Sequence, residues 1–294
     1  MDRAGVRAGC PVLCLGNVTL GGAGKTPAAL AVAALLAELG RTPAFLSRGY
    51  GGREAGPLRV DPDRHAAAEV GDEPLLLARR APTIVSRDRP AGAALCRRIG
   101  ADAIVMDDGL QNPSLAKDLS LAVVDAVVGA GNGLPFPAGP LRAPLARHWP
   151  HVGGLIVIGA GAPGDAIAGM AESRSLPVHR ARLVRESDDW AGRRCLAFAG
   201  IGRPEKFFAT LAEAGAVIAA RRAFPDHHAY QDGELAALAE DAIRLDATLV
   251  TTEKDAVRLS AAFAAEVRVL RVRLAFDDPE ALRRQVQRAL DAAP

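Results

Sequence analysis

Residues 11–39, PVLCLGNVTLGGAGKTPAALAVAALLAEL, constrain the fold of this chain more than any other stretch. Residues 12–15 form a short apolar run that is typical of a buried strand. A glycine-rich turn follows, then Lys25 and Thr26, and then an alanine- and leucine-rich segment that predicts a helix of about four turns. A strand, a glycine loop, Lys-Thr and a helix make up a P-loop, which binds nucleotide phosphates.

The predicted loop has the chemistry that a nucleoside triphosphate needs. Glycines let backbone N–H groups point inward, and the helix N-terminus adds a partial positive charge. The pattern G-x-x-x-x-G-K-[ST] is broken at one position, where Thr19 replaces glycine, and the alternative is a turn that only joins a strand to a helix. We expect phosphate binding by Thr19, Leu20, Gly21, Gly22, Ala23, Gly24, Lys25 and Thr26. Lys25 would reach the β- and γ-phosphates, and the Thr26 hydroxyl would hold Mg²⁺.

Composition excludes several classes of protein. The 294 residues suffice for one large or two modest domains, and a net charge of +2 argues against a dedicated nucleic-acid binder. The four cysteines lack paired metal-ligand spacing, which favours buried thiols in a reducing cytosol over a zinc site. No signal peptide is present, and the longest uncharged apolar stretch, residues 28–37, is too short to span a membrane.

A second strand signal ends in carboxylates. Residues 103–106, AIVM, run into Asp107 and Asp108. An apolar strand that ends in aspartate downstream of a P-loop is typical of a Walker B strand, whose carboxylate orders Mg²⁺ beside the P-loop threonine. We therefore expect Thr26, Asp107 and Asp108 to serve the metal.

Other polar motifs follow predicted strands or begin helices, and each allows more than one interpretation. SRGYGG presents Arg48 and Tyr50 at a strand end, either as a ligand-binding edge or as a solvated turn. Asp72 of GDEP either caps the helix predicted over 75–80 or faces a substrate. His227 of FPDHH either transfers protons beside a neighbouring carboxylate or caps a loop, and metal binding by this cluster is a third alternative.

The chain alternates predicted strands and helices, which favours an α/β fold with a mostly parallel sheet flanked by helices. We place a P-loop nucleotide- and metal-binding domain over residues 1–185 and a smaller C-terminal α/β domain over 186–294. Residues 129–150, rich in proline and glycine, predict either a packed connector or a surface that meets anionic lipid. Residues 159–169 predict a glycine- and alanine-rich loop.

The ordered motifs GNVTLGGAGKTP, SRGYGG, VGDEP, DDGLQ, PAGPLR, AGIGRPEKFF, FPDHH and TEKDAVR resemble the tetraacyldisaccharide 4′-kinases of lipid A synthesis. The resemblance runs from about residue 11 to the end. It implies ATP- and Mg²⁺-dependent phosphorylation of the 4′-hydroxyl of an acylated glucosamine disaccharide 1-phosphate, in a crevice between two α/β domains. It also implies a cytoplasmic enzyme that is peripheral on the inner membrane, with no nucleic-acid partner and no obligate protein partner.

The resemblance implies specific roles for residues of this chain. Asp72 looks like the catalytic carboxylate, paired with His227. The substrate headgroup would be contacted by Arg48, Tyr50, Arg89, Gln111 and Arg142. Two positions depart from the family pattern: Asn112 stands where histidine is usual, and Ala143 stands where glutamate is usual.

Two other classes of function stay open from the residues alone. A P-loop GTPase or metallochaperone would need a guanine-selecting motif, and residues 252–255, TEKD, nearly match one. A non-enzymatic ATP switch would bind ATP without transferring phosphate to an acceptor.

Overall fold

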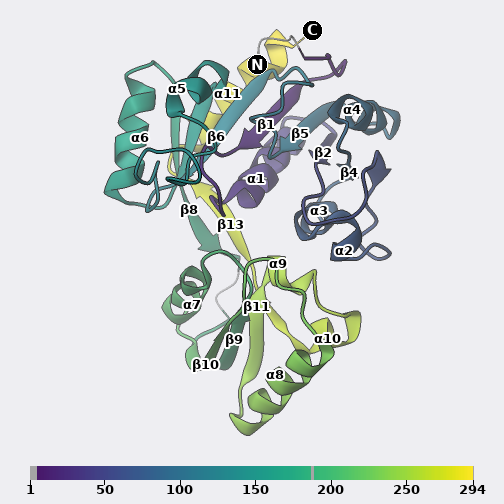
Figure 1. Ribbon diagram of the computed structural model, residues 1–294, viewed down its shortest axis with the longest axis vertical. Helices are drawn as coiled ribbons and strands as arrows, with labels where there is room; N and C mark the ends of the chain where they lie inside the picture. The colour runs from purple at the N-terminus through teal and green to yellow at the C-terminus, as the bar shows by residue number, and fades with distance from the viewer. Residues whose placement is uncertain (1–4, 187–188, 294) are drawn as a thin grey trace.

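The computed structural model describes residues 5–186 and 189–293, which form a larger and a smaller sheet (Figure 1). The strands of the larger sheet are β1 (Val12–Gly16), β2 (Pro43–Ser47), β3 (Leu58–Arg59), β4 (Thr83–Val85), β5 (Ala103–Asp107), β6 (Leu119–Asp125), β7 (Gly154–Ile158), β8 (Val178–Arg185) and β13 (Val272–Phe276). They lie in the order β13-β8-β7-β6-β1-β5-β2-β4-β3. Only the edge strands β3 and β13 run antiparallel to their neighbours. This arrangement confirms the mostly parallel sheet that the sequence predicts.

Alternate residues of the inner strands face two different apolar layers. In β1, Leu13 and Leu15 pack in the layer of α1 (Lys25–Glu38), whereas Val12 and Cys14 pack in the layer of α4 (Arg89–Arg98). A strand that is covered on both faces is apolar at every position. This double burial explains why residues 12–15 read as a continuous apolar run.

Helices cover both faces of the larger sheet. The remaining ones in this part are α2 (Ala67–Val70), α3 (Asp72–Ala78), α5 (Leu145–His148), α6 (Ala162–Glu172), α11 (Pro279–Ala292) and a 3-10 turn η1 (Trp149–His151). Helices α1 and α11 share one apolar layer, and α4 and α6 lie on the other face.

The prediction of a loop over residues 159–169 is wrong from Ala162 onward, where α6 begins. Ile167, Ala168 and Ala171 are buried in the apolar layer beneath this helix. Burial of an apolar face stabilises a helix even where glycine and proline lower its intrinsic propensity.

The smaller sheet contains four parallel strands in the order β10-β9-β11-β12. Its elements are β9 (Arg194–Ala199), α7 (Pro204–Glu213), β10 (Val217–Ala223), α8 (Asp232–Arg244), β11 (Thr248–Thr252), α9 (Glu253–Ala256), α10 (Ala261–Glu266) and β12 (Arg268–Leu270). Helix α7 packs Phe207 and Phe208 on one side of the sheet, and α8 packs Leu235 and Leu238 on the other.

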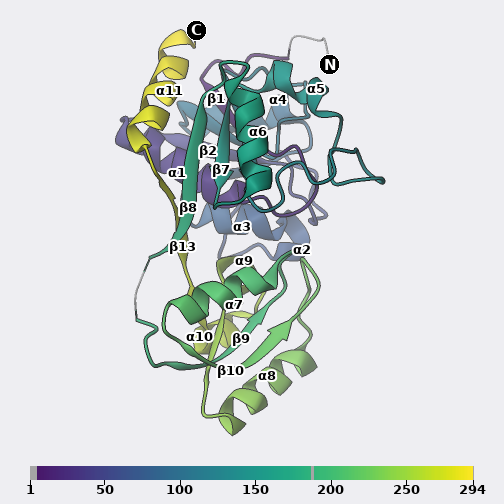
Figure 2. The same ribbon diagram turned by 90° about the vertical axis from the view of Figure 1, so that its left-hand side faces the viewer.

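The chain returns to the larger sheet after the smaller one. β13 pairs with β8, and Leu282, Val286 and Leu290 of α11 pack in the layer of α1. Figures 1 and 2 both show the yellow helix α11 beside the N-terminal elements. β13 and α11 lie within the C-terminal unit predicted over 186–294 but join the larger sheet and its helical layer, and the bounds of the two units stay a prediction.

The two sheets meet where strands of both end. Glu253, after β11, lies 3.3 Å from Arg80, which follows α3. Arg203, after β9, pairs with Asp125 at the end of β6. Within the described ranges, no helix has the length and apolar character needed to cross a membrane.

Candidate functional site

The loop between β1 and α1 has the geometry of a phosphate-binding turn. Gly24 has φ of +87°, and a Cβ there would lie 2.6 Å from Cδ1 of Ile158, so both backbone and space require glycine. Lys25 begins α1 and is largely buried, and its Nζ donates a hydrogen bond to Oδ1 of Asn17 at 3.3 Å. The Lys25 ammonium thus lies against the loop that is predicted to surround the phosphates.

Residues 140–142 brace the outer side of this loop. The backbone N–H of Leu20 donates to the carbonyl of Pro140 at 2.7 Å, and Thr19 forms an antiparallel bridge with Leu141. Thr19 therefore has extended backbone, which any residue adopts. This pairing explains why the chain tolerates threonine where the P-loop pattern has glycine.

Asp107 ends β5 beside β1, as the Walker B interpretation predicts. Its side chain is 1% exposed, and neither carboxylate oxygen receives a hydrogen bond from any residue that the structure describes. Burial, helped by the charge of Glu73, raises the pKa of Asp107 to about 7. Buried carboxylates ordinarily accept hydrogen bonds, so both oxygens of Asp107 stay available to a ligand.

Asp108 follows with φ of +50° and faces two cations. One carboxylate oxygen lies 3.7 Å from Nζ of Lys25, and the other lies 3.1 Å from Nη2 of Arg142. Arg142 also donates from Nε to the carbonyl of Thr19 at 3.3 Å. Arg142 therefore links the phosphate loop to the acidic pair.

The residues at this point suit Mg²⁺. Among the described residues no three His, Cys, Asp or Glu side chains cluster as a complete metal cage. Mg²⁺ in phosphate-transferring sites needs no such cage, because one or two carboxylates, a hydroxyl, water and the substrate phosphates bind it. The unpartnered oxygens of Asp107 and the Thr26 hydroxyl in the first turn of α1 supply that donor set.

The second acidic centre joins the two sheets. Asp72 is the first residue of α3 and is 4% exposed, and its Oδ2 lies 2.8 Å from Nδ1 of His227, in the loop after β10. Gly71, with φ of +90°, makes the turn that precedes it, where a Cβ would lie 2.5 Å from the carbonyl of Tyr50. The structure therefore brings together the two residues that the resemblance pairs.

Charges around this pair set its protonation. Burial acts to raise the pKa of Asp72, but the hydrogen bond with His227 and the charges of Lys254 and Arg258 bring it below its ordinary value. The hydrogen bond with Asp72 raises the pKa of His227, against the opposing effects of burial and Lys254. Asp72 is consequently an ionised carboxylate at neutral pH.

The residues predicted to contact the headgroup lie in different settings. Arg48 and Tyr50 are exposed, and the Tyr50 ring packs edge-on against His227 at 5.7 Å. Arg89 is only 2% exposed and donates to the Ser86 carbonyl, so its guanidinium lies beneath the surface. Of this predicted set, Tyr50 alone contacts the Asp72–His227 pair through a ring contact.

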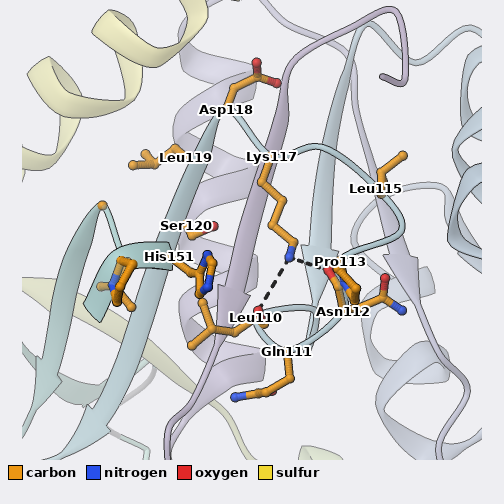
Figure 3. A pocket seen from close by; sticks show the side chains of 13 residues that line it. Leu110, Gln111, Asn112, Pro113, Leu115, Lys117, Asp118, Leu119, Ser120 and His151 are labelled. Atoms are coloured by element: carbon orange, nitrogen blue, oxygen red, sulfur yellow. Dashed lines mark hydrogen bonds between the residues drawn. The ribbon is translucent and has the colours of Figure 1, made fainter. Parts of the chain in front are cut away.

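Gln111 and Asn112, although adjacent, serve different parts of the molecule. Gln111 donates from Nε2 to the Asn17 carbonyl at 2.9 Å, which supports the phosphate loop. Asn112 accepts instead from Ser114, and its carbonyl accepts from Lys117, in the pocket of Figure 3. The departure at Asn112 therefore leaves its carboxamide in a local turn. Ala143, the second departure, is half-buried directly after Arg142.

The TEKD segment is engaged inside the smaller sheet. Asp255 is fully buried, and it accepts hydrogen bonds from the Gly200 N–H at 2.8 Å and the Tyr230 hydroxyl at 2.7 Å. A further ion pair joins it to Arg258. A guanine-selecting aspartate needs free acceptors for the base, so these contacts argue against the GTPase interpretation.

Two groups of charged residues in this region were not predicted as site residues from the sequence. Lys254 contacts the His227 ring, and no site role was predicted for it beyond its place in the TEKDAVR motif. Asp125, at the end of β6, binds Arg203 and Lys206 near the start of α7, with Nζ of Lys206 at 2.5 Å. Asp125 thereby links the larger sheet to the smaller one.

The chain is similar to known proteins both in sequence and in structure. The family model "Tetraacyldisaccharide-1-P 4′-kinase" (LpxK) matches residues 2–291. A tetraacyldisaccharide 4′-kinase of Methylobacterium radiotolerans is 82% identical over 292 residues, which cover 99% of this chain and 90% of the relative. One of Methylorubrum extorquens is 69% identical over 100% of this chain and 90% of the relative. A crystal structure of "apo" form LpxK from Aquifex aeolicus in complex with ATP has a TM-score of 0.74 at 24% identity, over 98% of this chain and 91% of that one.

Proposed function

The chain belongs to the tetraacyldisaccharide-1-P 4′-kinase family, and we propose that it transfers the γ-phosphate of ATP to the 4′-hydroxyl of a tetraacylated glucosamine disaccharide 1-phosphate. This reaction belongs to lipid A biosynthesis. The observation that supports the residue roles best is the buried Asp72, held by His227 at 2.8 Å where the two sheets meet. A carboxylate so placed is positioned to meet an acceptor hydroxyl that enters between them.

The phosphate loop holds ATP through charge and backbone donors. Lys25 binds the β- and γ-phosphates, and the N–H groups of residues 19–26 surround them at the N-terminus of α1. Thr26, Asp107 and Asp108 would hold Mg²⁺, which would supply positive charge against the phosphates. Arg142, which contacts both Thr19 and Asp108, keeps the loop and the acidic pair in register.

Asp72 takes the proton of the acceptor. The 4′-oxygen forms a bond to the γ-phosphorus while the bond from that phosphorus to the β,γ-bridging oxygen breaks, and ADP leaves. A carboxylate of low pKa is too weak to deprotonate a sugar hydroxyl beforehand, so the proton moves to Asp72 late, as the new bond forms. His227 orients the carboxylate through its Nδ1–H and shares the charge.

The lipid part of the substrate requires an apolar surface near the phosphate loop. Leu134 and Phe136 are 49% and 68% exposed, and their segment pairs with the loop through Leu141 and Thr19. Figure 2 shows the teal segment between β6 and α5 standing out from the body of the protein. We assign this segment to the contact with acyl chains, and with the cytoplasmic face of the inner membrane as a peripheral protein. Exposed Arg48, and Tyr50, whose ring packs against His227, are assigned to the headgroup.

Phosphate transfer to a disaccharide 1-phosphate lipid in mixed micelles tests this function, with wild type and Asp72→Ala side by side. We expect transfer by wild type, and a large loss of kcat in Asp72→Ala with ATP affinity retained. Loss of ATP binding in the variant would instead indicate a structural role for Asp72. ATP binding by folded wild type without transfer would support the switch interpretation.

A further inference from the structure

Lys254, in α9, has its ammonium close to both members of the Asp72–His227 pair. Its Nζ lies 3.3 Å from Nε2 of His227 and 4.0 Å from Oδ2 of Asp72. The Lys254 side chain is 23% exposed, so solvent screens the contact only in part. The function proposed above gives this lysine no role.

The donor and acceptor inventory of these three groups favours one arrangement. A lysine ammonium has only donors, so its 3.3 Å contact favours an Nε2 of His227 that carries no proton. The ionised Asp72 has only acceptors, so Nδ1 of His227 must donate at 2.8 Å. These two contacts together favour a neutral imidazole that is protonated on Nδ1.

The charges around His227 come from several elements. Asp72 of α3 favours the charged imidazolium, and Asp226, in the same loop as His227, lies 3.9 Å from Nε2. Lys254 opposes both, because a protonated Nε2 would place one N–H cation against another. Tyr50 contacts the ring edge-on, and no other titratable side chain contacts the ring by hydrogen bond, ion pair or ring packing in the described part of the chain.

Lys254 is itself held in place by acids. Glu73 lies 3.5 Å and Asp226 3.7 Å from its Nζ, in addition to Asp72. Arg258, one turn further along the chain, lies 3.8 Å from Oδ2 of Asp72 and donates to the carbonyls of Gly200 and His228. Acidic groups from α3 and from the His227 loop thus hold the ammonium close to the ring.

We propose that Lys254 is a positioning residue whose ammonium holds His227 in the neutral Nδ1–H tautomer, which leaves Asp72 as the acceptor of the sugar proton. Without the ammonium, His227 takes up a proton at higher pH. The resulting imidazolium would weaken Asp72 as a proton acceptor. This inference rests on the proposed function for its kinetic consequence, but the state of the His227 ring is independent of the substrate.

The test compares wild type, Lys254→Met and Lys254→Arg. Met keeps the length of the side chain without its charge, and Arg keeps the charge. NMR of protein labelled with ¹⁵N-histidine follows the ring nitrogens with pH, and His227→Gln identifies the His227 signals. The same three proteins are assayed for phosphate transfer from pH 5 to pH 9, with thermal melting as a check of folding.

We expect wild type to show the Nδ1–H tautomer, and Lys254→Met to titrate His227 about one pH unit higher. The acidic limb of its kcat profile should move by the same amount, with little change in either KM, and Lys254→Arg should restore the wild-type position. An unchanged His227 titration, a wild-type ring protonated on Nε2, a uniform loss of kcat at every pH, or a rise in acceptor KM alone would each overturn the proposal. If wild type transfers no phosphate, the proposed function fails, and the NMR titration still decides the role of Lys254.

Discussion

Nδ1 of His227 lies 2.8 Å from Oδ2 of Asp72, although the two residues are 155 positions apart in the chain. One residue begins a helix of the larger sheet, and the other lies in a loop of the smaller sheet. The pair exists only when both sheets are folded and docked. Its chemistry therefore depends on how firmly the two parts are held.

The protonation of His227 should make its contribution to stability depend on pH. Its folded pKa is raised above the unfolded value, so the stabilisation is fully present below the unfolded pKa of about 6.5 and declines as pH rises through the folded pKa. We expect His227→Gln to lose more unfolding free energy at pH 6 than at pH 9, as measured by urea denaturation. An equal loss at both values would contradict this assignment.

Asp107 should destabilise the metal-free protein as pH rises. Its folded pKa of about 7 lies above that of an unfolded aspartate, so the folded state binds the extra proton and stability falls between about pH 4 and pH 7. We expect Mg²⁺ with a nucleotide to reverse this fall. Asp107→Asn should abolish both the pH dependence and the Mg²⁺ effect in thermal melting. Asp102→Asn, at a half-exposed carboxylate away from the phosphate loop, should preserve both.

Arg142 should support nucleotide binding through the phosphate loop. It donates to the Thr19 carbonyl and pairs with Asp108, so Arg142→Ala removes two contacts at once. We expect Arg142→Ala to weaken the free energy of ATP binding by about 1.4 kcal/mol, which is a roughly tenfold lower affinity, as measured by calorimetry. Arg147→Ala, at an exposed arginine of the same segment, should bind ATP as wild type does. Equal effects of the two substitutions would argue against the bracing role.

Asp125 should hold the two sheets together. It is 6% exposed, and its partners Arg203 and Lys206 are partly exposed, so solvent reduces the contribution of the pairs. We expect Asp125→Asn to lower the unfolding free energy by about 1–2 kcal/mol. Asp165→Asn breaks a surface pair with Arg180 and should cost less than about 0.5 kcal/mol. Urea denaturation of both variants makes the comparison.

The sequence predicted the elements whose signals are local. The strand before the phosphate loop, the loop itself and α1 follow from adjacent residues, and Asp107 follows from the apolar run that precedes it. Helix α6 was expected as a loop, because its glycines and alanines carry no visible pattern until Ile167 is seen packed in the core.

Contacts between residues far apart in the chain could not be predicted from the spacing of sequence motifs. β13 returns to pair with β8, so that Leu274 lies opposite Leu183. Neither strand's own sequence predicts this pairing. The Asp72–His227 pair came from motif resemblance, and nothing in either motif alone pointed to the other. Lys254 went unassigned because its partners are contributed by α3 and by the loop after β10.

The most direct test of the account is a double-mutant comparison of phosphate transfer in single turnover, with saturating MgATP and acceptor. Asp72→Asn, His227→Gln and the double variant are compared with wild type. Because the two side chains act as one unit, the double variant should be no slower than Asp72→Asn alone. Losses that multiply in the double variant would contradict a shared role, and Asp72 and His227 would then act independently.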